Sequence, residues 1–541
     1  MIRGSVNITL AIFPPVLYRN RFLKVISYNS SNIPIMKKLA ALIVFFITLS
    51  ATAQPLKAKI KIDNERIVGE IDKNLYGNFT EHLGRCIYGG IYDPKSQQAN
   101  ADGFRKDVID ASAKMGVSIV RWPGGNFASG YHWMDGIGPK ENRPKRKDLA
   151  WGDIESNEVG IDEFMKFTKT AAVEPYICVN LGTGSLDEAR NWVEYCNAKT
   201  GLYFSDLRAK NGHPQPYHIK YWGLGNEIDG EWQMGHKNAE DYSKFALEAA
   251  KLMKWSDDSI KLVVSGSSNY NDKWIDWNRT VLTALRDQAD YISLHHYSGN
   301  YDKDHYKFMA ITTRVENIIK ITEGLINEVR TKYRMQKPIY IAFDEYNVWY
   351  RAYNEQKLEE HYNMQDVLVV AMYLNTFLRH ANTVKMANMA QLVNVIAPMM
   401  ITNDKLWMQT IYYPLQLFSS NCLGQSLENY VDCPTYDAGD YKKIPYLDVS
   451  SVYNEKTNEL VINVVNRHQD QPIETTIINQ HGKLAANAAV SEVNSADMKD
   501  ENSVNEQKVK TTEKKLMVNG DSFIYRFPAH SFTQIKIRLT L

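Results

Sequence analysis

Short apolar segments and helix-like segments alternate eight times along the middle of the chain, and this repeat constrains the fold more than any other feature. The apolar segments are too short for helices and lie at 75–79, 118–122, 175–180, 220–225, 261–266, 291–297, 339–345 and 384–389. Helical patterns lie between them, at 104–114, 162–170, 187–199, 239–255, 314–333 and 360–380. Such alternation favours parallel strands joined by helical crossovers. We therefore predict an α/β fold in which residues 73–395 form a (β/α)8 TIM barrel.

The C-terminal part of the chain has a different period. Apolar and polar residues alternate at 460–466 and 532–537, which predicts β-strands. We expect residues 396–541 to form mainly a jelly-roll-like β-sandwich. The segment 58–68, ahead of the barrel, is also strand-like, so we expect residues 54–72 to join that sandwich.

One C-terminal segment lacks any apolar period. Residues 491–515 are rich in Glu, Lys, Asn and Ser. We predict a long solvated loop there.

The N-terminus carries the pattern of a processing signal. Residues 36–38 are Met-Lys-Lys, 39–49 are mostly apolar, and 51–53 are Ala-Thr-Ala. We predict a signal peptide at 36–53 and an exported protein, periplasmic or secreted, with residues 1–35 as an over-extended start. The apolar run is too short for a permanent membrane anchor.

Composition narrows the class of partner. The chain has 63 basic and 62 acidic side chains, a net charge of +1. Such a balance gives no long-range field for nucleic acid or anionic lipid, so we expect neither. A neutral partner such as carbohydrate fits, and the 11 Trp and 32 Tyr supply flat rings suited to sugar faces as well as to a core.

Cysteine and histidine spacing argues against a disulfide scaffold and a metal centre. The five cysteines are few and scattered, at Cys86, Cys178, Cys196, Cys422 and Cys433. Cys422 and Cys433 are the closest pair in sequence, and spacing alone leaves a bridge between them open. The chain has no CxxC or HExxH motif, so we predict no metal site and no cofactor.

Two of the predicted strands end on a glutamate. Residues 221–227 read YWGLGNE and residues 339–345 read IYIAFDE, and these are the fourth and seventh strands of the barrel. The C-terminal ends of barrel strands carry the functional groups, and glycosidases use two carboxyl groups there as acid/base and nucleophile. Alternation along a strand sends only one of two neighbours inward, so we expect Asp344 to make structural contacts beside Glu345.

With these motifs the chain resembles glycoside hydrolase family 51, whose members are chiefly α-L-arabinofuranosidases. The most specific matches are 76–90 (YGNFTEHLGRCIYGG), 121–127 (RWPGGNF), 133–139 (WMDGIGP) and the two glutamate strands. The resemblance implies a retaining barrel enzyme with its acids on strands four and seven, and no cofactor. It also implies a homo-oligomer, often a hexamer, that acts on arabinose-containing polysaccharides or oligosaccharides.

The resemblance also implies roles for particular residues. Glu227 matches the general acid/base and Glu345 the nucleophile of a double-displacement mechanism. Matches to substrate-binding positions are Glu81, Asn126, Asn226, His295, Tyr297 and Gln391. His295 is chosen over its neighbour His296 by that match. Glu81 is expected to accept hydrogen bonds from hydroxyl groups and to favour an electron-poor transition state by its charge.

Two alternatives remain open from sequence. A β-glucanase or another retaining glycosidase could use the same scaffold, because the fold and the acids determine retention more firmly than the sugar. A noncatalytic carbohydrate-binding protein is the second alternative, although binding alone needs no paired acids. The main prediction is an exo-acting enzyme that releases terminal α-L-arabinofuranosyl residues.

Overall fold

A computed structural model describes residues 56–352 and 358–540 of the 541-residue chain. The predicted over-extended start at 1–35 and the predicted signal peptide at 36–53 lie outside the described residues.

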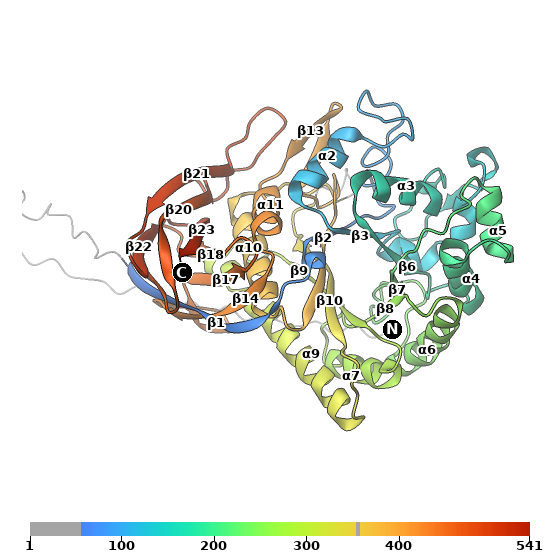
Figure 1. Cartoon of the computed structure of the whole chain (residues 1–541). Helices are drawn as coiled ribbons and strands as arrows, with labels where there is room; N and C mark the ends of the chain where they lie inside the picture. Colours follow the sequence, from blue (N-terminus) through green and yellow to red (C-terminus); the bar gives the residue numbers. More distant parts are fainter. Residues whose placement is uncertain (1–55, 353–357, 541) are drawn as a thin grey trace, which may run out of the picture. The chain divides into compact units, whose positions relative to one another are not determined.

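Eight parallel strands close into a barrel, as predicted (Figure 1). They are β2 (Gly77–Phe79), β3 (Ile119–Trp122), β6 (Glu174–Val179), β7 (Tyr221–Leu224), β8 (Lys261–Val264), β9 (Tyr291–Ser298), β10 (Tyr340–Val348) and β11 (Val384–Ala390). Neighbours around the ring follow the order of the sequence, and β11 closes it by pairing with β2. Each of the eight predicted strands is present, with its ends shifted by a few residues. The prediction of a TIM barrel is therefore confirmed.

Helices follow most of the barrel strands. They are α2 (Lys106–Met115), α3 (Ile161–Ala171), α4 (Leu186–Asn197), α5 (Tyr203–Lys210), α6 (Ala239–Ser256), α7 (Trp274–Leu285), α8 (His305–Met309), α9 (Thr312–Lys332), α10 (Met364–Arg379) and α11 (Tyr412–Asn421). Short 3-10 turns are η1 (Lys73–Tyr76), η2 (Asn126–Gly130), η3 (Trp133–Gly136) and η4 (Lys140–Asn142). None of the helices within the described ranges combines the length and the apolar character needed to cross a bilayer.

The inside of the barrel is built in layers because every second residue of a strand points inward. An apolar and aromatic layer contains Ile119, Tyr176, Tyr221, Val263, Tyr291, Ala342 and Met386, one from each of seven strands. Two residues further along their strands, Arg121, Ser293 and Asp344 are also buried. The barrel therefore changes from an apolar to a charged interior towards the C-terminal ends of its strands.

A second domain is built on a nine-stranded sheet with its own apolar core, which confirms the predicted C-terminal β-sandwich. The strand order is β21 (Lys510–Met517), β20 (Lys483–Asn494), β23 (Ser531–Thr540), β18 (Glu459–Asn466), β17 (Leu447–Asn454), β14 (Gln425–Asp432), β1 (Leu56–Glu70), β19 (Ile473–Asn479) and β22 (Ser522–Phe527). In Figure 1 the blue β1 lies among the orange and red strands of this sheet.

Three small two-stranded sheets are present in the described part of the chain. They pair β4 (Arg146–Lys147) with β5 (Ile154–Glu155), β12 (Met399–Thr402) with β13 (Lys405–Met408), and β15 (Thr435–Ala438) with β16 (Tyr441–Pro445).

All five cysteines are free, so the open possibility of a bridge between Cys422 and Cys433 is not realised.

The predicted loop at 491–515 is wrong in part. β20 extends to Asn494 and pairs antiparallel with β21, which begins at Lys510. β21 is the edge strand of the sheet, and most of its side chains are exposed. A strand that is solvated on both faces has no apolar alternation to detect, so its sequence resembles that of a loop.

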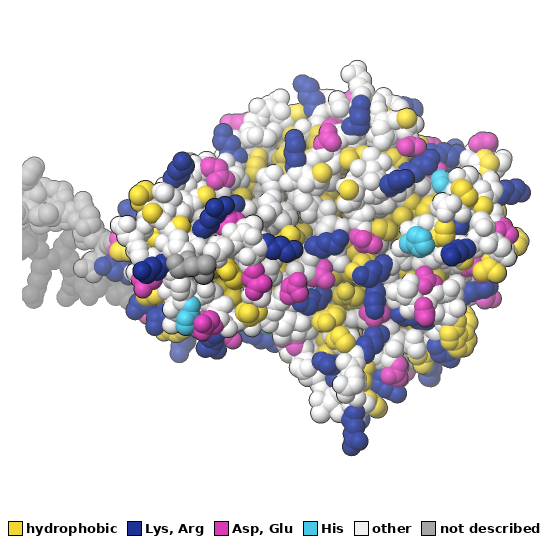
Figure 2. Space-filling view, in the orientation of Figure 1, with side chains coloured by type: hydrophobic (Ala, Val, Ile, Leu, Met, Phe, Trp, Pro, Cys, Tyr) yellow, Lys and Arg dark blue, Asp and Glu magenta, His cyan; other side chains and the backbone are white. Residues whose placement is uncertain are grey.

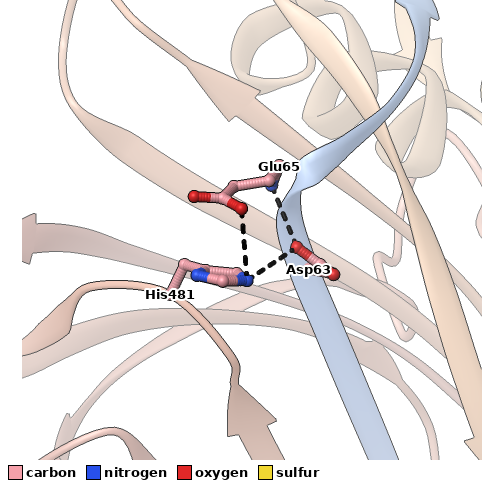
Figure 3. Close-up of side chains that lie close together, drawn as sticks. All are labelled: Asp63, Glu65 and His481. Carbon is pink, nitrogen blue, oxygen red and sulfur yellow. Dashed lines mark hydrogen bonds and ion pairs between the residues drawn. The ribbon is translucent and has the colours of Figure 1, made fainter.

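Charged side chains join β1 to the turn between β19 and β20 (Figure 3). His481 Nε2 lies 3.4 Å from Asp63 Oδ1 and 3.5 Å from Glu65 Oε2. The first strand thus contacts the sheet through side chains as well as through its pairing with β14 and β19.

A buried carboxylate links the barrel to the sandwich. Asp448 on β17 accepts hydrogen bonds from Asn375 and Arg379 of α10, at 2.7 and 3.1 Å, and from Arg467 at 2.7 Å. Both Asp448 and Arg467 are buried. A buried ion pair of this kind is sensitive to the loss of one member, because the other charge stays without compensation.

Removing this carboxylate should destabilise the protein. We expect Asp448→Ala to lower the free energy of unfolding by about 3–5 kcal/mol, measured by urea denaturation. Asp437→Ala, which removes an exposed carboxylate near Lys442, is the matched control and should change stability little. Equal stability of the two variants would contradict the structural role of Asp448.

Candidate active site

A cavity of about 610 Å³ opens at the C-terminal ends of the barrel strands. Seven of the eight site residues predicted from sequence line it, namely Glu81, Asn126, Glu227, His295, Tyr297, Glu345 and Gln391. The eighth, Asn226, is buried behind Glu227 and accepts a hydrogen bond from Arg121. The structure therefore brings all the predicted residues to one place, although strands far apart in sequence supply them.

The two glutamates lie close together. Glu227 follows β7 in a left-handed backbone conformation, with φ of 45°, and Glu345 lies within β10. One oxygen of each carboxylate and one nitrogen of His295 all lie within 4.8 Å of one another. Retaining glycosidases hold their carboxyl groups about 5 Å apart, whereas inverting enzymes need about 6.5–9.5 Å to fit a water. The close approach of the two oxygens is consistent with the retaining class.

His295 lies between the acids as a buried cation. Its Nδ1 is 2.9 Å from Glu227 and 3.5 Å from Glu345, and its Nε2 is 3.3 Å from Asp344. Burial alone would lower the pKa of His295, but Glu345, Asp344 and Glu227 outweigh it and raise the pKa to about 10. Both ring nitrogens are then N–H donors at neutral pH.

His296 has a different environment. Its Nδ1 lies 2.7 Å from the hydroxyl of Tyr373, and burial together with Arg314 lowers the pKa of His296 to about 3. It lines part of the cavity as a neutral ring. Of the two adjacent histidines, only His295 contacts the acids.

Arg121 is the central residue that sequence reasoning missed. This buried guanidinium donates to Glu345 Oε1 at 2.6 Å and to Asn226 Oδ1, and its Nε lies 3.6 Å from Asp344. Burial opposes the charge, but Asp344 and Glu345 raise the pKa of Arg121 well above its usual value. The sequence did contain a signal for Arg121. It follows the inward-facing Ile119 by two positions on the same strand, so it also faces inward, and a buried positive charge needs an anionic partner.

Asp344 makes structural contacts, as expected, but it faces the inside of the barrel together with Glu345. Both side chains pair with Arg121, so the expectation that only one of the two neighbours faces inward is wrong. The register of β10 shifts between Ala342 and Glu345, which breaks the alternation there.

Asp344 accepts hydrogen bonds from Tyr176 at 2.8 Å and from Ser293. Burial would raise the pKa of Asp344, but Arg121 and His295 outweigh it and hold the pKa at about 2. Asp344 is thus a fixed anion below the two glutamates.

Glu81 lies on the opposite wall of the cavity. Its carboxyl group accepts from the backbone N–H of Phe127 and the indole of Trp151, both at 3.0 Å, and from Gln391 at 3.3 Å. Burial outweighs these contacts and raises the pKa of Glu81 to about 8. Near neutral pH this carboxyl group is then mostly neutral, which does not support the expectation that its charge favours the transition state. A neutral carboxyl group donates as well as accepts a hydrogen bond. An added Cβ at Gly125 would lie 2.5 Å from Glu81 Oε2, so the glycine leaves room for this carboxyl group.

The remaining predicted residues present polar atoms to the cavity or to the acids. Tyr297 donates its hydroxyl to Glu345 Oε2 at 2.8 Å. Asn126 Oδ1 and Asn226 Nδ2 are buried and have no hydrogen-bond partner in the described part of the chain. Buried polar atoms without partners are unfavourable, so these amides are suited to a ligand that supplies hydroxyl groups.

Several aromatic residues complete the cavity, and the sequence pattern did not single them out. Trp151, Trp232, Tyr270 and Trp349 line it. Trp232 donates its indole N–H to Glu227 Oε2 at 2.7 Å. On the face shown in Figure 2, basic and acidic side chains are mixed, as expected for a neutral partner.

Among the residues that the structure describes, two groups of side chains could offer ligands to a metal ion. Glu227, His295 and Glu345 form one, and Asp63, Glu65 and His481 of the sheet form the other. Arg121 and the protonated His295 already place two positive charges at the first group, which disfavours a further cation. The second group does not line the cavity. The absence of a metal and of a cofactor stays a prediction.

Known families match most of the barrel and the sandwich. The "Alpha-L-arabinofuranosidase 1 domain" matches residues 111–316, and the "Alpha-L-arabinofuranosidase C-terminal domain" matches residues 344–531.

Individual relatives agree with these matches. An "Intracellular exo-alpha-(1->5)-L-arabinofuranosidase 1" of Bacillus subtilis is 46% identical over 434 residues, 78% of this chain and 87% of that protein. A similarly named protein of Acetivibrio thermocellus is 40% identical over 485 residues, 86% and 96% of the two chains.

Solved structures share the fold. A family 51 α-L-arabinofuranosidase from Bifidobacterium longum superposes with a TM-score of 0.85 at 33% identity, over 89% of this chain and 99% of that one. A family 51 enzyme from Thermotoga petrophila gives 0.83 at 37% identity, over 89% and 100%. These relatives favour the arabinofuranosidase reading over a β-glucanase or a noncatalytic binding protein.

The prediction of export is contradicted by these comparisons. The relatives from Bacillus and Acetivibrio are named intracellular, and no signal peptide is shown at 36–53. The prediction used a basic start, a short apolar run and small residues at 51–53. This pattern depends on residue type alone, so it is a weak guide to export.

The separation of the two acids, the shared architecture and the identity with named relatives lead to one assignment. The chain belongs to glycoside hydrolase family 51, the family of retaining α-L-arabinofuranosidases.

Proposed function

We propose that this protein removes terminal α-L-arabinofuranosyl residues from arabinan, arabinoxylan or oligosaccharides derived from them. Glu345 is the nucleophile and Glu227 the general acid/base. The observation that carries this proposal is the approach of the two carboxylates to within 4.8 Å at the end of a closed barrel.

In the first step Glu345 attacks the anomeric carbon. Arg121 donates to its Oε1 and Tyr297 to its Oε2, so both oxygens are oriented. A protonated Glu227 gives its proton to the glycosidic oxygen, the C–O bond breaks, and the leaving group departs as an alcohol. A covalent arabinosyl ester of Glu345 results.

In the second step Glu227 acts as a base. Its carboxylate accepts a proton from water as the water attacks the anomeric carbon and displaces Glu345. Two inversions at the same carbon give net retention. His295, which contacts Glu227 and lies near Glu345, supports the negative charge that moves between them.

The sugar ring is held by the surrounding polar groups. We propose that Glu81, Asn126, Asn226, His295, Tyr297 and Gln391 bind its hydroxyl groups. The unpartnered amide atoms of Asn126 and Asn226 support this role. With its raised pKa, Glu81 can also donate a hydrogen bond to the sugar near neutral pH.

The two parts of the chain have separate tasks in this proposal. Residues 73–395 form the catalytic domain, because they contain every proposed site residue. Residues 396–541, with the first strand from 54–72, mainly form the supporting β-sandwich.

The stereochemical outcome tests the reaction. With an aryl α-L-arabinofuranoside as substrate, time-resolved proton NMR should show the α anomer of arabinose first, because a double displacement retains configuration. Early β anomer would exclude the assigned pair of roles. A folded protein with no turnover would indicate a different glycoside.

The nucleophile can be tested by a single substitution. Glu345→Gln should reduce kcat by about 10⁴-fold or more while the fold stays intact, because the amide cannot form the covalent intermediate. Steady-state kinetics and circular dichroism measure the two effects. Glu328→Gln, an exposed glutamate on α9, is the matched control. Substantial activity in the Glu345 variant would remove it from this role.

We also propose that the protein is a homo-oligomer, a hexamer by resemblance to its family. Exposed apolar side chains at Met134, Leu149 and Ile154, close in sequence, are suited to an interface between copies. Light scattering coupled to gel filtration should give about six times the mass of one chain. The mass of a single chain would contradict the proposal.

A further inference from the structure

The two oxygens of Glu227 have different hydrogen-bond donors. Oε1 lies 2.9 Å from His295 Nδ1, and Oε2 accepts from Trp232 Nε1 at 2.7 Å. Two N–H donors on one carboxyl group favour its ionised form. A general acid needs a proton on the oxygen that faces the glycosidic bond, so one of these donors must leave Glu227 before the first step.

His295 is fixed in place. It is buried, and its two nitrogens lie near three carboxylates, those of Glu227, Glu345 and Asp344. Moving it would leave buried charges unpaired.

Trp232 is less enclosed than His295. Its side chain is 52% exposed at the wall of the cavity, and within residues 56–352 and 358–540 its hydrogen bond is to Glu227. Oε2 is therefore the oxygen that an incoming glycosidic oxygen can reach.

The residues on either side of Trp232 are anchored by hydrogen bonds to neighbouring segments. Asp229 accepts from the backbone N–H groups of Ser268 and Asn269, both at 2.8 Å, and Gln233 donates to Ser129. A Cβ at Gly230 would lie 2.4 Å from Cε2 of the Trp232 ring. The chain thus keeps a glycine where the indole must lie to reach Glu227.

We propose that Trp232 is a positioning residue whose indole N–H occupies Oε2 of Glu227 in the free enzyme, and that the glycosidic oxygen of the substrate replaces it there. This inference rests on the proposed acid/base role of Glu227. Binding of the leaving group thereby coincides with protonation of the acid.

The protons balance through the cycle. When the indole leaves, Oε2 takes up a proton from solvent and passes it to the leaving group as the C–O bond breaks. In the second step Glu227 receives one proton from water. That proton returns to solvent after the sugar departs, and the indole N–H binds Oε2 again.

The pH dependence of Trp232→Phe tests the proposal. This variant keeps an aromatic ring but lacks the N–H. The substrate is α-1,5-arabinobiose, whose poor leaving group makes the first step limiting. In the pH profile of kcat/KM, the apparent pKa of the alkaline limb should rise by about 0.5 to 1 pH unit, which corresponds to the loss of one net hydrogen bond. The alkaline limb of kcat should stay in place, because kcat/KM reports the free enzyme and kcat the complex.

Two further variants test whether the effect depends on the position of the indole. Gly230→Ala keeps the tryptophan but displaces its ring, and should move the kcat/KM limb in the same direction. Trp255→Phe, at an exposed position on α6, is the matched control and should leave both profiles unchanged. If both limbs move together in Trp232→Phe, or if neither moves, the proposal is overturned.

A separate measurement distinguishes this inference from the role on which it rests. Glu227→Ala should lose activity that azide restores with an aryl substrate, because azide needs no general base. It attacks the anomeric carbon of the covalent intermediate, displaces Glu345 and leaves as an arabinosyl azide. Activity without azide would overturn the role of Glu227 and this inference with it. Rescue by azide together with unmoved profiles in Trp232→Phe would overturn only the role of Trp232.

Discussion

The charge of Arg121 inside the barrel is the interaction on which the active site depends. A buried guanidinium is stable only when anions and hydrogen-bond acceptors surround it. Here Glu345 and Asp344 supply the charge and Asn226 supplies a further acceptor. Because these partners come from different strands, the barrel must close in the correct register for the charge to be compensated. Folding of the barrel and assembly of the site are therefore the same event.

The layer below explains why this cluster is rigid. Tyr176 lies in the apolar layer of the barrel, yet its hydroxyl donates to Asp344. Asp344 in turn lies near Arg121 and His295. A packed aromatic core thus fixes the anion that orients the two cations, and the cations orient the glutamates. Little reorganisation is left for the reaction itself, as electrostatic preorganisation requires.

The sequence predicted the parts of this protein whose environments are strongly patterned. The eight barrel strands are buried on both faces, so they were visible as apolar runs, and the glutamates that end the fourth and seventh runs followed directly. His295 needed the family resemblance, because alternation alone could not choose between it and His296. Arg121 could have been found from its inward register two positions after Ile119.

Other features lacked a local signal. β21 is solvated on both faces, so burial left no period in its sequence. Trp232 reaches Glu227 only because the chain turns back at Gly230, and the contact depends on that turn rather than on a strand or helix period. The basic start and apolar run at 36–53 lie outside the described residues, so their pattern had no contacts to be checked against. It led to the wrong expectation of export.

The environments of the two glutamates account for their different proposed tasks. Glu345 accepts from the permanent cation Arg121, which is buried, and from the partly buried Tyr297. Glu227 shares the cation His295 but has a half-exposed, neutral second donor in Trp232. The five charged groups Arg121, His295, Asp344, Glu345 and Glu227 are electrically neutral as a set only when Glu227 holds a proton. Delivery of that proton makes the set negative, next to the carbon where positive charge develops in the transition state. The same carboxyl group that releases the leaving group therefore also stabilises the charge that its departure creates.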